Sequence, residues 1–204
     1  LRKYNTNAID PDASLATTMQ PFYKAEFIAK ADSGIKTLAD IKGKSFCFVD
    51  PNSTSGYIIP RIIMKANGID PDTDITAINA GSHNNVGIGV YKGQCDAGVA
   101  YVDVLTDQSA NLAATYPDIA TVVVPFMVSD KIPNDGVQVV KTLDPKITEA
   151  VVNGLLAMEQ DPGGAAILKK LYNINGMEKI DATFYDDFAK ILKDAGVDPA
   201  ELVK

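Results

Sequence analysis

The stretch SFCFVDPNSTSGYIIPRII, residues 45–63, contains the strand-to-helix transition that decides the fold. The apolar run at residues 45–49 predicts a buried strand, which Asp50-Pro51 ends. A polar loop follows at residues 52–56, and isoleucines on one face then predict a helix over residues 57–66. A buried strand, a short polar loop and a helix form one unit of an α/β fold.

Similar units recur on both sides of this stretch. Short β-rich runs alternate with helix-like segments, and this alternation predicts an α/β fold with a mostly parallel sheet. The further strands are expected at residues 27–30, 75–78, 96–101, 120–124 and 136–140. After the last of these runs, the chain is expected to be almost entirely helical, with Asp144-Pro145 and Asp161-Pro162 at helix starts.

The chain divides into three expected parts. Residues 1–33 form an incoming hinge or crossing segment, residues 34–124 an α/β ligand-binding lobe, and residues 125–204 a return crossing with one strand and helices. An isolated strand cannot satisfy its backbone groups or bury its faces. We therefore expect the last part to belong to a second lobe, whose remaining sheet is missing from this sequence or supplied by residues before Gly34.

The composition is that of a globular protein with an acidic balance. The 204 residues include 19 Lys and Arg against 26 Asp and Glu, which gives a formal net charge of -7. This charge argues against a nucleic-acid partner or an anionic membrane surface, because both need a basic face. An anionic small ligand stays open, since a pocket can be locally electropositive. No stretch reaches the roughly 18 apolar residues that a membrane-spanning helix needs.

The chain has two cysteines, Cys47 and Cys95. Their spacing fits no zinc-binding pattern. Two cysteines are the minimum for one disulfide in an exported protein, and they can equally be two buried, reduced side chains. The residues alone leave both interpretations open.

Three polar loops follow predicted parallel strands, at residues 52–56, 81–85 and 101–103. Open α/β sheets bind ligands at the carboxyl ends of their strands, so the loops are expected to converge. In the first, Ser53-Thr54-Ser55-Gly56 offers three hydroxyls and unpaired backbone N–H groups that suit an oxyanion. Gly56 would let the backbone approach a ligand closely. Helix capping explains one such hydroxyl as well, so the loop alone leaves capping and anion binding open.

Single residues elsewhere carry weaker signals. His83, the only histidine, can donate a ring N–H to an oxyanion, but a surface or capping histidine is commoner. Asp103 can accept from an amine or a protonated ligand oxygen, although a helix N-cap explains it equally. Asp50 is similar, with a turn as the simpler explanation. Tyr23 fits a pocket aromatic or a half-buried strand residue.

Together these stretches resemble the phosphonate, phosphite and phosphate-type solute-binding proteins of ABC importers. The resemblance rests on order and spacing from about Tyr23 to the helix after Pro145. The Ser-Thr-Ser loop combined with the Gly-Ser-His loop is fairly specific, whereas LADIKGK is shared widely among binding proteins of this fold. The matching stretches are ADSGI (31–35), LADIKGK (38–44), FVDPNSTSGY (48–57), GSHN (81–84), GQCDAG (93–98) and IPND (132–135).

The resemblance implies a type II periplasmic-binding fold, whose two lobes close on a ligand. It implies a phosphonate, phosphite or phosphate as the ligand, a membrane permease as the partner, and no cofactor or metal. The location would be periplasmic or extracellular, and a missing N-terminal segment could carry a lipid anchor. Self-association of the shortened chain is a further expectation, since its sheet edge would be exposed.

The family's ligand-binding residues carry over by position. Its Ser-Thr-Ser hydroxyls and nearby N–H groups hold the phosphorus oxygens, which maps to Ser53, Thr54 and Ser55. The histidine of the second loop maps to His83, and the acidic pocket residue to Asp103. A tyrosine in the incoming crossing, which often lies over the ligand, maps to Tyr23.

The chain departs from the family pattern in two places. Asn84 stands where the family often has Asp, which would alter ligand protonation or the pairing of His83. The family also has roughly another hundred residues before Tyr23, which agrees with the missing half-sheet expected from backbone satisfaction. In the implied fold, the strands that hold Cys47 and Cys95 are close neighbours, so a disulfide is allowed there.

Two other function classes remain open. An enzyme on the same fold could act on a phosphate-bearing small molecule through His83 and the serine cluster, since fold does not fix function. The chain has neither a nucleophile-elbow motif nor a metal-ligand set, however. A ligand-sensing domain would need a fused DNA-binding or membrane segment, and neither is in this chain. We therefore expect a transport protein and not an enzyme.

Overall fold

Five strands form the central sheet of the computed structural model, which describes residues 1–5, 14–194 and 196. The strand order is β4-β3-β5-β2-β6. In this order the strands are Thr76–Asn79, Ser45–Phe48, Ala97–Tyr101, Ala25–Lys30 and Val123–Val128. β3 runs parallel to β4 and β5, as expected, but β2 runs antiparallel to β5 and β6. The sheet is therefore mixed: β6 runs in the same direction as β3, β4 and β5, so four strands share one direction as predicted, and β2 alone runs against them. The sequence could not single out β2, because hydrophobic runs carry no information about strand direction.

The strand β2 ties the incoming segment into the lobe. Its residues from Ala25 to Ala29 are at most 2% exposed, and it pairs with a neighbour on each side. The sheet thus begins before the expected lobe boundary at Gly34 and continues through Val128. The expected strand at residues 120–124 begins only at Val123, because the preceding residues form the short helix α4, Ile119–Val122.

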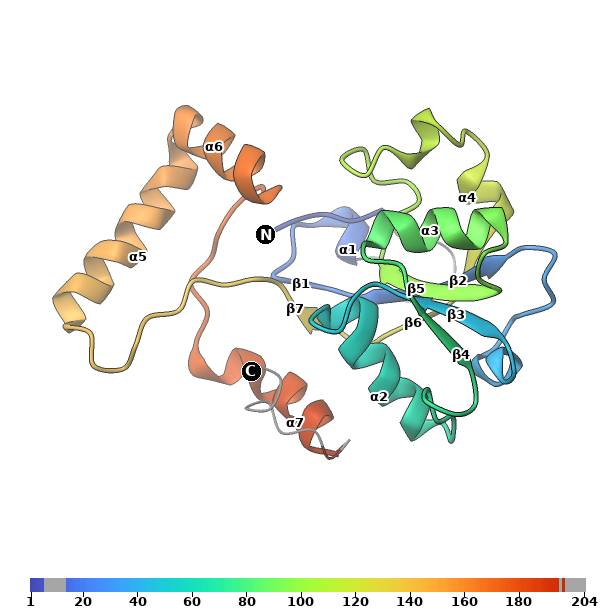
Figure 1. Cartoon of the computed structure of the whole chain (residues 1–204). Helices are drawn as coiled ribbons and strands as arrows, with labels where there is room; N and C mark the ends of the chain where they lie inside the picture. Colours follow the sequence, from blue (N-terminus) through green and yellow to red (C-terminus); the bar gives the residue numbers. More distant parts are fainter. Residues whose placement is uncertain (6–13, 195, 197–204) are drawn as a thin grey trace.

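Alternating side chains of β3 build a core on each face of the sheet. Phe46 and Phe48 pack on one face against α2, Ile59–Ala66, through Ile59 and Met64. Cys47 points to the other face and packs against α3, His83–Lys92, through Val86 and Val90. Figure 1 shows these two helices on opposite sides of the sheet.

The remaining elements of the lobe are short. The sequence also predicts a short helix that begins at Thr37 and a helical stretch after Val104. The first forms as a 3-10 helix, whereas turns and one 3-10 helix replace the second. Two short strands, β1 (Phe22–Tyr23) and β7 (Ile132–Pro133), pair antiparallel where the chain enters and leaves the lobe. The other short elements are α1 (Ser14–Thr17), η1 (Leu38–Ile41), η2 (Thr54–Ile58), η3 (Leu112–Ala114) and η4 (Ala182–Tyr185).

The C-terminal part has helices but no sheet of its own among the described residues. Asp144 and Asp161 cap α5 (Pro145–Gln160) and α6 (Pro162–Tyr172), as predicted, and α7 (Asp186–Asp194) follows. The strand expected at residues 136–140 does not form there, because no described strand lies beside it to complete its hydrogen bonds. The sequence also predicts a short terminal turn at Asp198-Pro199, and these residues lie outside the described part of the chain.

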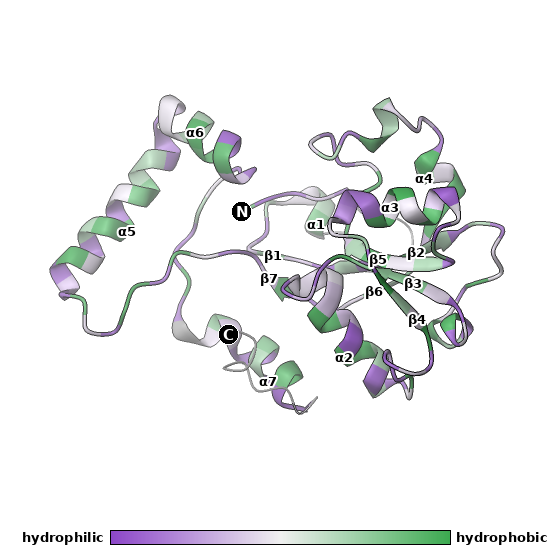
Figure 2. Cartoon of the chain, viewed as in Figure 1, coloured by the Kyte–Doolittle hydropathy of each residue, from purple (hydrophilic) through white to green (hydrophobic). Residues whose placement is uncertain are grey.

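α5 and α6 stand apart from the sheet (Figure 1), and apolar residues recur along both helices (Figure 2). Val140, Leu171 and Tyr172 are 65–69% exposed, and Ile147 is 53% exposed. Neither of the two sheets of the described residues covers these side chains. Within the described ranges, no helix combines the length and apolar character needed to cross a membrane.

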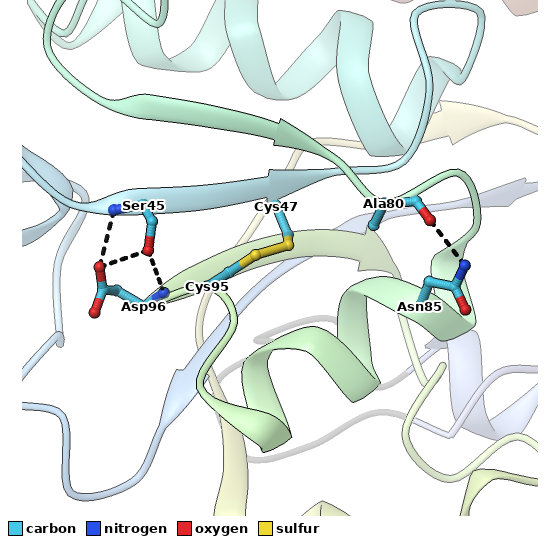
Figure 3. Close-up of a disulfide and its surroundings, with 6 residues drawn as sticks. All are labelled: Ser45, Cys47, Ala80, Asn85, Cys95 and Asp96. Atoms are coloured by element: carbon cyan, nitrogen blue, oxygen red, sulfur yellow. Dashed lines mark hydrogen bonds between the residues drawn. A yellow bond between two sulfur atoms is a disulfide. The ribbon is translucent and has the colours of Figure 1, made fainter.

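A disulfide joins Cys47 on β3 to Cys95, which lies just before β5 (Figure 3). The two Cα atoms are 5.8 Å apart, and both side chains are at most 2% exposed. Beside it, the Ser45 hydroxyl donates to the Asp96 carboxylate at 2.7 Å and accepts from the Asp96 N–H at 3.0 Å. The bridge and these hydrogen bonds fix β3 against β5 at the centre of the lobe.

Replacing both cysteines by alanine is expected to lower the free energy of unfolding by roughly 2–4 kcal/mol. The bridge closes a loop between residues 48 positions apart, and its loss restores the conformational entropy of the unfolded chain. Urea denaturation of oxidised protein measures the change. An unchanged unfolding midpoint would show that the bridge adds no stability. Adding reductant to the double variant should have no effect, which controls for indirect effects.

Candidate functional site

A cleft of about 930 Å³ lies where the N-terminal segment, β1, the loop after β3 and the start of α3 meet the C-terminal segments. Three of the expected site residues line it: Tyr23, Ser55 and His83. These residues are far apart in the sequence, and the carboxyl ends of the parallel strands β3 and β4 bring the loops of Ser55 and His83 together, as expected for an open α/β sheet.

The Ser-Thr-Ser loop forms a single wide helical turn, η2, at the end of β3. The Ser53 hydroxyl caps this turn by accepting from the Gly56 N–H at 3.1 Å. The Ser55 side chain is only 2% exposed, yet it borders the cleft and forms a hydrogen bond with the Tyr23 side chain. Ser53 thus caps the turn, while Ser55 borders the cleft. Thr54 is half-buried and is not among the lining residues.

Gly56 is needed for packing against the preceding strand. A Cβ atom on it would lie 2.2 Å from Val49 Cγ2, a distance that side chains do not tolerate. Its carbonyl also accepts from the Val49 N–H at 3.0 Å. Gly56 does not border the cleft, so its small size lets the turn fold back onto β3 and does not serve a ligand's approach.

His83 begins α3, and Ser82 caps that helix through its hydroxyl. The His83 Nδ1 atom accepts from the Tyr101 backbone N–H at 3.1 Å, so the proton of the neutral ring is on Nε2. Nε2 lies 3.5 Å from Ser53 Oγ, on the side of the Ser-Thr-Ser loop. Burial lowers the pKa of His83 to about 4, against the opposing charge of Asp50. The ring is therefore an uncharged N–H donor of fixed tautomer at neutral pH.

Asp103 is placed behind the cleft and is not among the residues that line it. It is 6% exposed and has a φ of 72°, and its Oδ2 accepts from the Asn5 N–H at 2.7 Å. Its Oδ1 is buried with no hydrogen-bond partner among the described residues. Burial raises the pKa of Asp103 to about 7, helped by Asp107 and opposed by the Asn5 N–H and Arg2. The residue holds the N-terminal segment in place.

Sequence reasoning missed two further lining residues, Arg2 and Tyr4, whereas Tyr101 lines the cleft from the expected loop at residues 101–103. Arg2 forms an ion pair with Asp107, which also accepts from the Tyr101 hydroxyl at 2.7 Å. Burial alone would raise the pKa of Asp107, but hydrogen bonds from Tyr101, Ser109 and Arg2 hold it at about 2. The only available signal for Arg2 and Tyr4 was a cation and an aromatic residue two positions apart in the expected incoming hinge or crossing segment.

Asn84, which departs from the family pattern, points away from His83. Its side-chain amide donates to the Ala110 carbonyl at 3.3 Å and thereby fastens the loop after β5 to α3. The partner of His83 at Nδ1 is a backbone N–H. In this chain, the tautomer of the histidine is consequently set by the main chain and not by a carboxylate.

Comparisons with known proteins agree on one family. The family model of the periplasmic substrate-binding protein of phosphonate ABC transporters matches residues 5–185. The "Phosphate-import protein PhnD" of Mycolicibacterium smegmatis is 37% identical over 97 residues, which are 44% of this chain and 30% of that relative. This chain therefore aligns with less than a third of that curated relative's length.

Solved structures with the same fold include several binding proteins. A Pseudomonas aeruginosa binding protein of an ABC phosphonate transporter has a TM-score of 0.66 and 23% identity, over 87% of this chain and 59% of that one. PhnD1 of Prochlorococcus marinus, solved with methylphosphonate, has a TM-score of 0.61 and 17% identity, over 86% and 68%. These likenesses show a type II periplasmic-binding fold, of which this chain is a part.

We expect the imidazole of His83 to titrate with a pKa of about 4, well below its ordinary value of 6.5, because the ring is buried. NMR of the ring carbons and nitrogens between pH 3 and pH 8 measures the pKa, and the nitrogen shifts report the Nε2–H tautomer. As the only histidine, it needs no assignment. A midpoint near 6.5 or an Nδ1–H tautomer would contradict this geometry.

The same shift affects stability in a defined direction. Between pH 6.5 and about 4 the unfolded chain binds more protons at this residue, so its contribution to stability falls as the pH falls. Asp103 acts in the opposite sense, since its raised pKa adds stability as the pH falls from about 7 toward 3.8. The two contributions overlap, which is why a residue-specific titration is the appropriate measurement.

Proposed function

The chain belongs to the family of periplasmic substrate-binding proteins of phosphonate ABC transporters, and on that premise we propose that it captures a phosphorus oxyanion for an importer. The ligand is held in the cleft by Ser55 and His83 and passed to a membrane permease when the lobes open. The observation that carries the proposal is that the Ser55 hydroxyl and the uncharged ring of His83 border one cleft beside two helix starts.

The donors at this site suit phosphorus oxygens in more than one protonation state. A hydroxyl donates to an ionised oxygen and accepts from a protonated one, and the Tyr23 hydroxyl joined to Ser55 has the same ability. The start of α3 adds the partial positive charge of a helix N-terminus at His83. The site can therefore take phosphate, phosphite or a phosphonate, and the names of the two relatives, with phosphate and methylphosphonate, favour this class.

In this proposal, the other candidate residues from the sequence position the site and do not contact the ligand. Ser53 and Gly56 shape the turn that carries Ser55, and Thr54 lies between them. Asp103 anchors the N-terminal segment through Asn5, so that Arg2 and Tyr4 reach the cleft. We assign these four residues to positioning the site, with the direct contacts made by Ser55, His83 and Tyr23.

Transport fits the site better than catalysis. A serine nucleophile needs a base whose free ring nitrogen faces the hydroxyl. Here the unprotonated nitrogen of His83, Nδ1, already accepts a hydrogen bond from the Tyr101 N–H. The nitrogen near Ser53, Nε2, carries the proton. The ring can donate a hydrogen bond at this position, but it cannot take the serine proton. This geometry favours binding over acyl or phosphoryl transfer.

Isothermal titration calorimetry on full-length protein with phosphate, phosphite, methylphosphonate and 2-aminoethylphosphonate tests the proposal. We expect tight binding of at least one, with Ser55→Ala and His83→Ala each weakening it about 10- to 100-fold, because each removes a hydrogen bond to a charged group. Ser53→Ala should weaken it less, since its hydroxyl caps the turn.

Thr73→Ala serves as the matched control, because this exposed threonine is not among the residues that line the cleft. Its affinity should equal that of the unchanged protein. If none of the four oxyanions binds to correctly folded protein, the assignment of this ligand class is wrong, and the loop hydroxyls serve only the local structure.

A further inference from the structure

The guanidinium of Arg2 is held rigidly on the wall of the cleft. Its side chain is 18% exposed and forms the ion pair with Asp107. The guanidinium carbon lies 4.8 Å from the ring centre of Tyr4 and 5.7 Å from that of Tyr101. An ion pair and two aromatic rings leave this side chain little freedom, so its charge has a fixed place.

Two aromatic side chains connect this cation to the two proposed oxyanion donors. Tyr4 stacks on Tyr23 at 6.1 Å, and Tyr23 is hydrogen-bonded to Ser55. On the other side, the ring of Tyr101 meets the ring of His83 edge-on at 5.0 Å. Arg2 is therefore separated from His83 by one aromatic ring and from Ser55 by two, and all three residues line the same cleft.

The sign of the charge at this place has a chemical consequence. The proposed oxyanion donors are uncharged, whereas an arginine stays protonated at every physiological pH. Asp107 offsets part of this charge through the ion pair, but neither Asp107 nor Asp103 lines the cleft, so the pair presents its guanidinium end to a ligand. The other described charged residues of the cleft are exposed, and water screens them. They are Asp135, Lys141, Glu178, Lys179 and Asp181.

We propose that Arg2 determines specificity at this site, selecting phosphonates with a neutral or anionic organic substituent and rejecting aminoalkylphosphonates. This inference rests on the proposed function, because it concerns the substituent of the same ligand. A cationic ammonium group placed against Tyr4 and Tyr101 meets the fixed guanidinium and is repelled. A carboxylate in the same place gains a charged partner whose N–H donors can bind both of its oxygens.

Calorimetry with three phosphonates of similar size tests the inference on the full-length protein. They are 2-carboxyethylphosphonate, propylphosphonate and 2-aminoethylphosphonate. We expect 2-aminoethylphosphonate to bind about fivefold more weakly than propylphosphonate, and 2-carboxyethylphosphonate to bind at least as tightly as propylphosphonate. An effect of this size is what two charges about one side chain apart produce in a partly hydrated cleft. This comparison needs no variant, so it stands even if substitutions at Arg2 impair folding.

Arg2→Gln and Arg2→Lys then assign the effect. Glutamine retains a donor for Asp107 without the charge and should remove the discrimination against the amine, whereas lysine retains the charge and should preserve it. Asp135→Asn is the matched control, since it changes an exposed charge in the same cleft and should leave the order of the three ligands unchanged. Thermal melts confirm that each variant is folded.

The outcomes separate this inference from the proposed function. If none of the three phosphonates and no inorganic oxyanion binds, the proposed function is wrong and this inference falls with it. If phosphonates bind but the amine binds most tightly, or the order is the same in Arg2→Gln, the proposed function survives and the role of Arg2 is refuted. Loss of the amine's affinity only in Asp135→Asn would assign selectivity to that carboxylate instead.

Discussion

The antiparallel insertion of β2 between β5 and β6 is the constraint on which the arrangement of the cleft depends. β2 is almost wholly buried and is hydrogen-bonded along both edges, so the segment before it cannot shift without breaking the sheet. Tyr23 is two residues before this strand, and its position beside Ser55 follows directly. The incoming segment is thereby part of the lobe that carries the site.

The site combines uncharged donors with one fixed cation. Burial keeps the His83 ring neutral, and the Tyr101 N–H determines which nitrogen carries the proton. The Arg2 charge lies beyond the aromatic rings, held by a carboxylate that faces away from the cleft. Neutral donors tolerate several protonation states of an oxyanion, while a distant cation acts on the rest of the ligand. Affinity and selectivity can therefore be set by different residues.

Much of the fold could be predicted from patterns close in sequence. The buried strand at Ser45–Phe48, the helix after Ser55 and the caps at Asp144 and Asp161 all follow from local hydrophobicity and turn chemistry. Strand direction could not be predicted, because β2 reads the same in either orientation. The strand expected at residues 136–140 does not form, because a strand needs neighbouring strands that the local sequence does not encode.

The site was predictable only in part. Three residues that the resemblance named, Ser55, His83 and Tyr23, border the cleft, but which serine caps the turn and which borders the cleft depends on the width of one helical turn. Arg2 and Tyr4 reach the cleft through the anchoring of Asn5 by Asp103, a contact across 98 positions. Asp103 was expected on the pocket wall, and it is in the support behind it. No local sequence pattern indicates a contact between residues this far apart in the chain.

The pairing of β1 with β7 has a mechanical consequence. The chain enters and leaves the lobe through these two short strands, which are joined to each other by Phe22 opposite Pro133 and Tyr23 opposite Ile132. Two joined ribbons bend about a shared axis, so any rotation of the C-terminal part would turn both together. Tyr23 is one of the paired residues and is hydrogen-bonded to Ser55. A change in the angle between the two parts would then also change how closely the cleft fits a ligand.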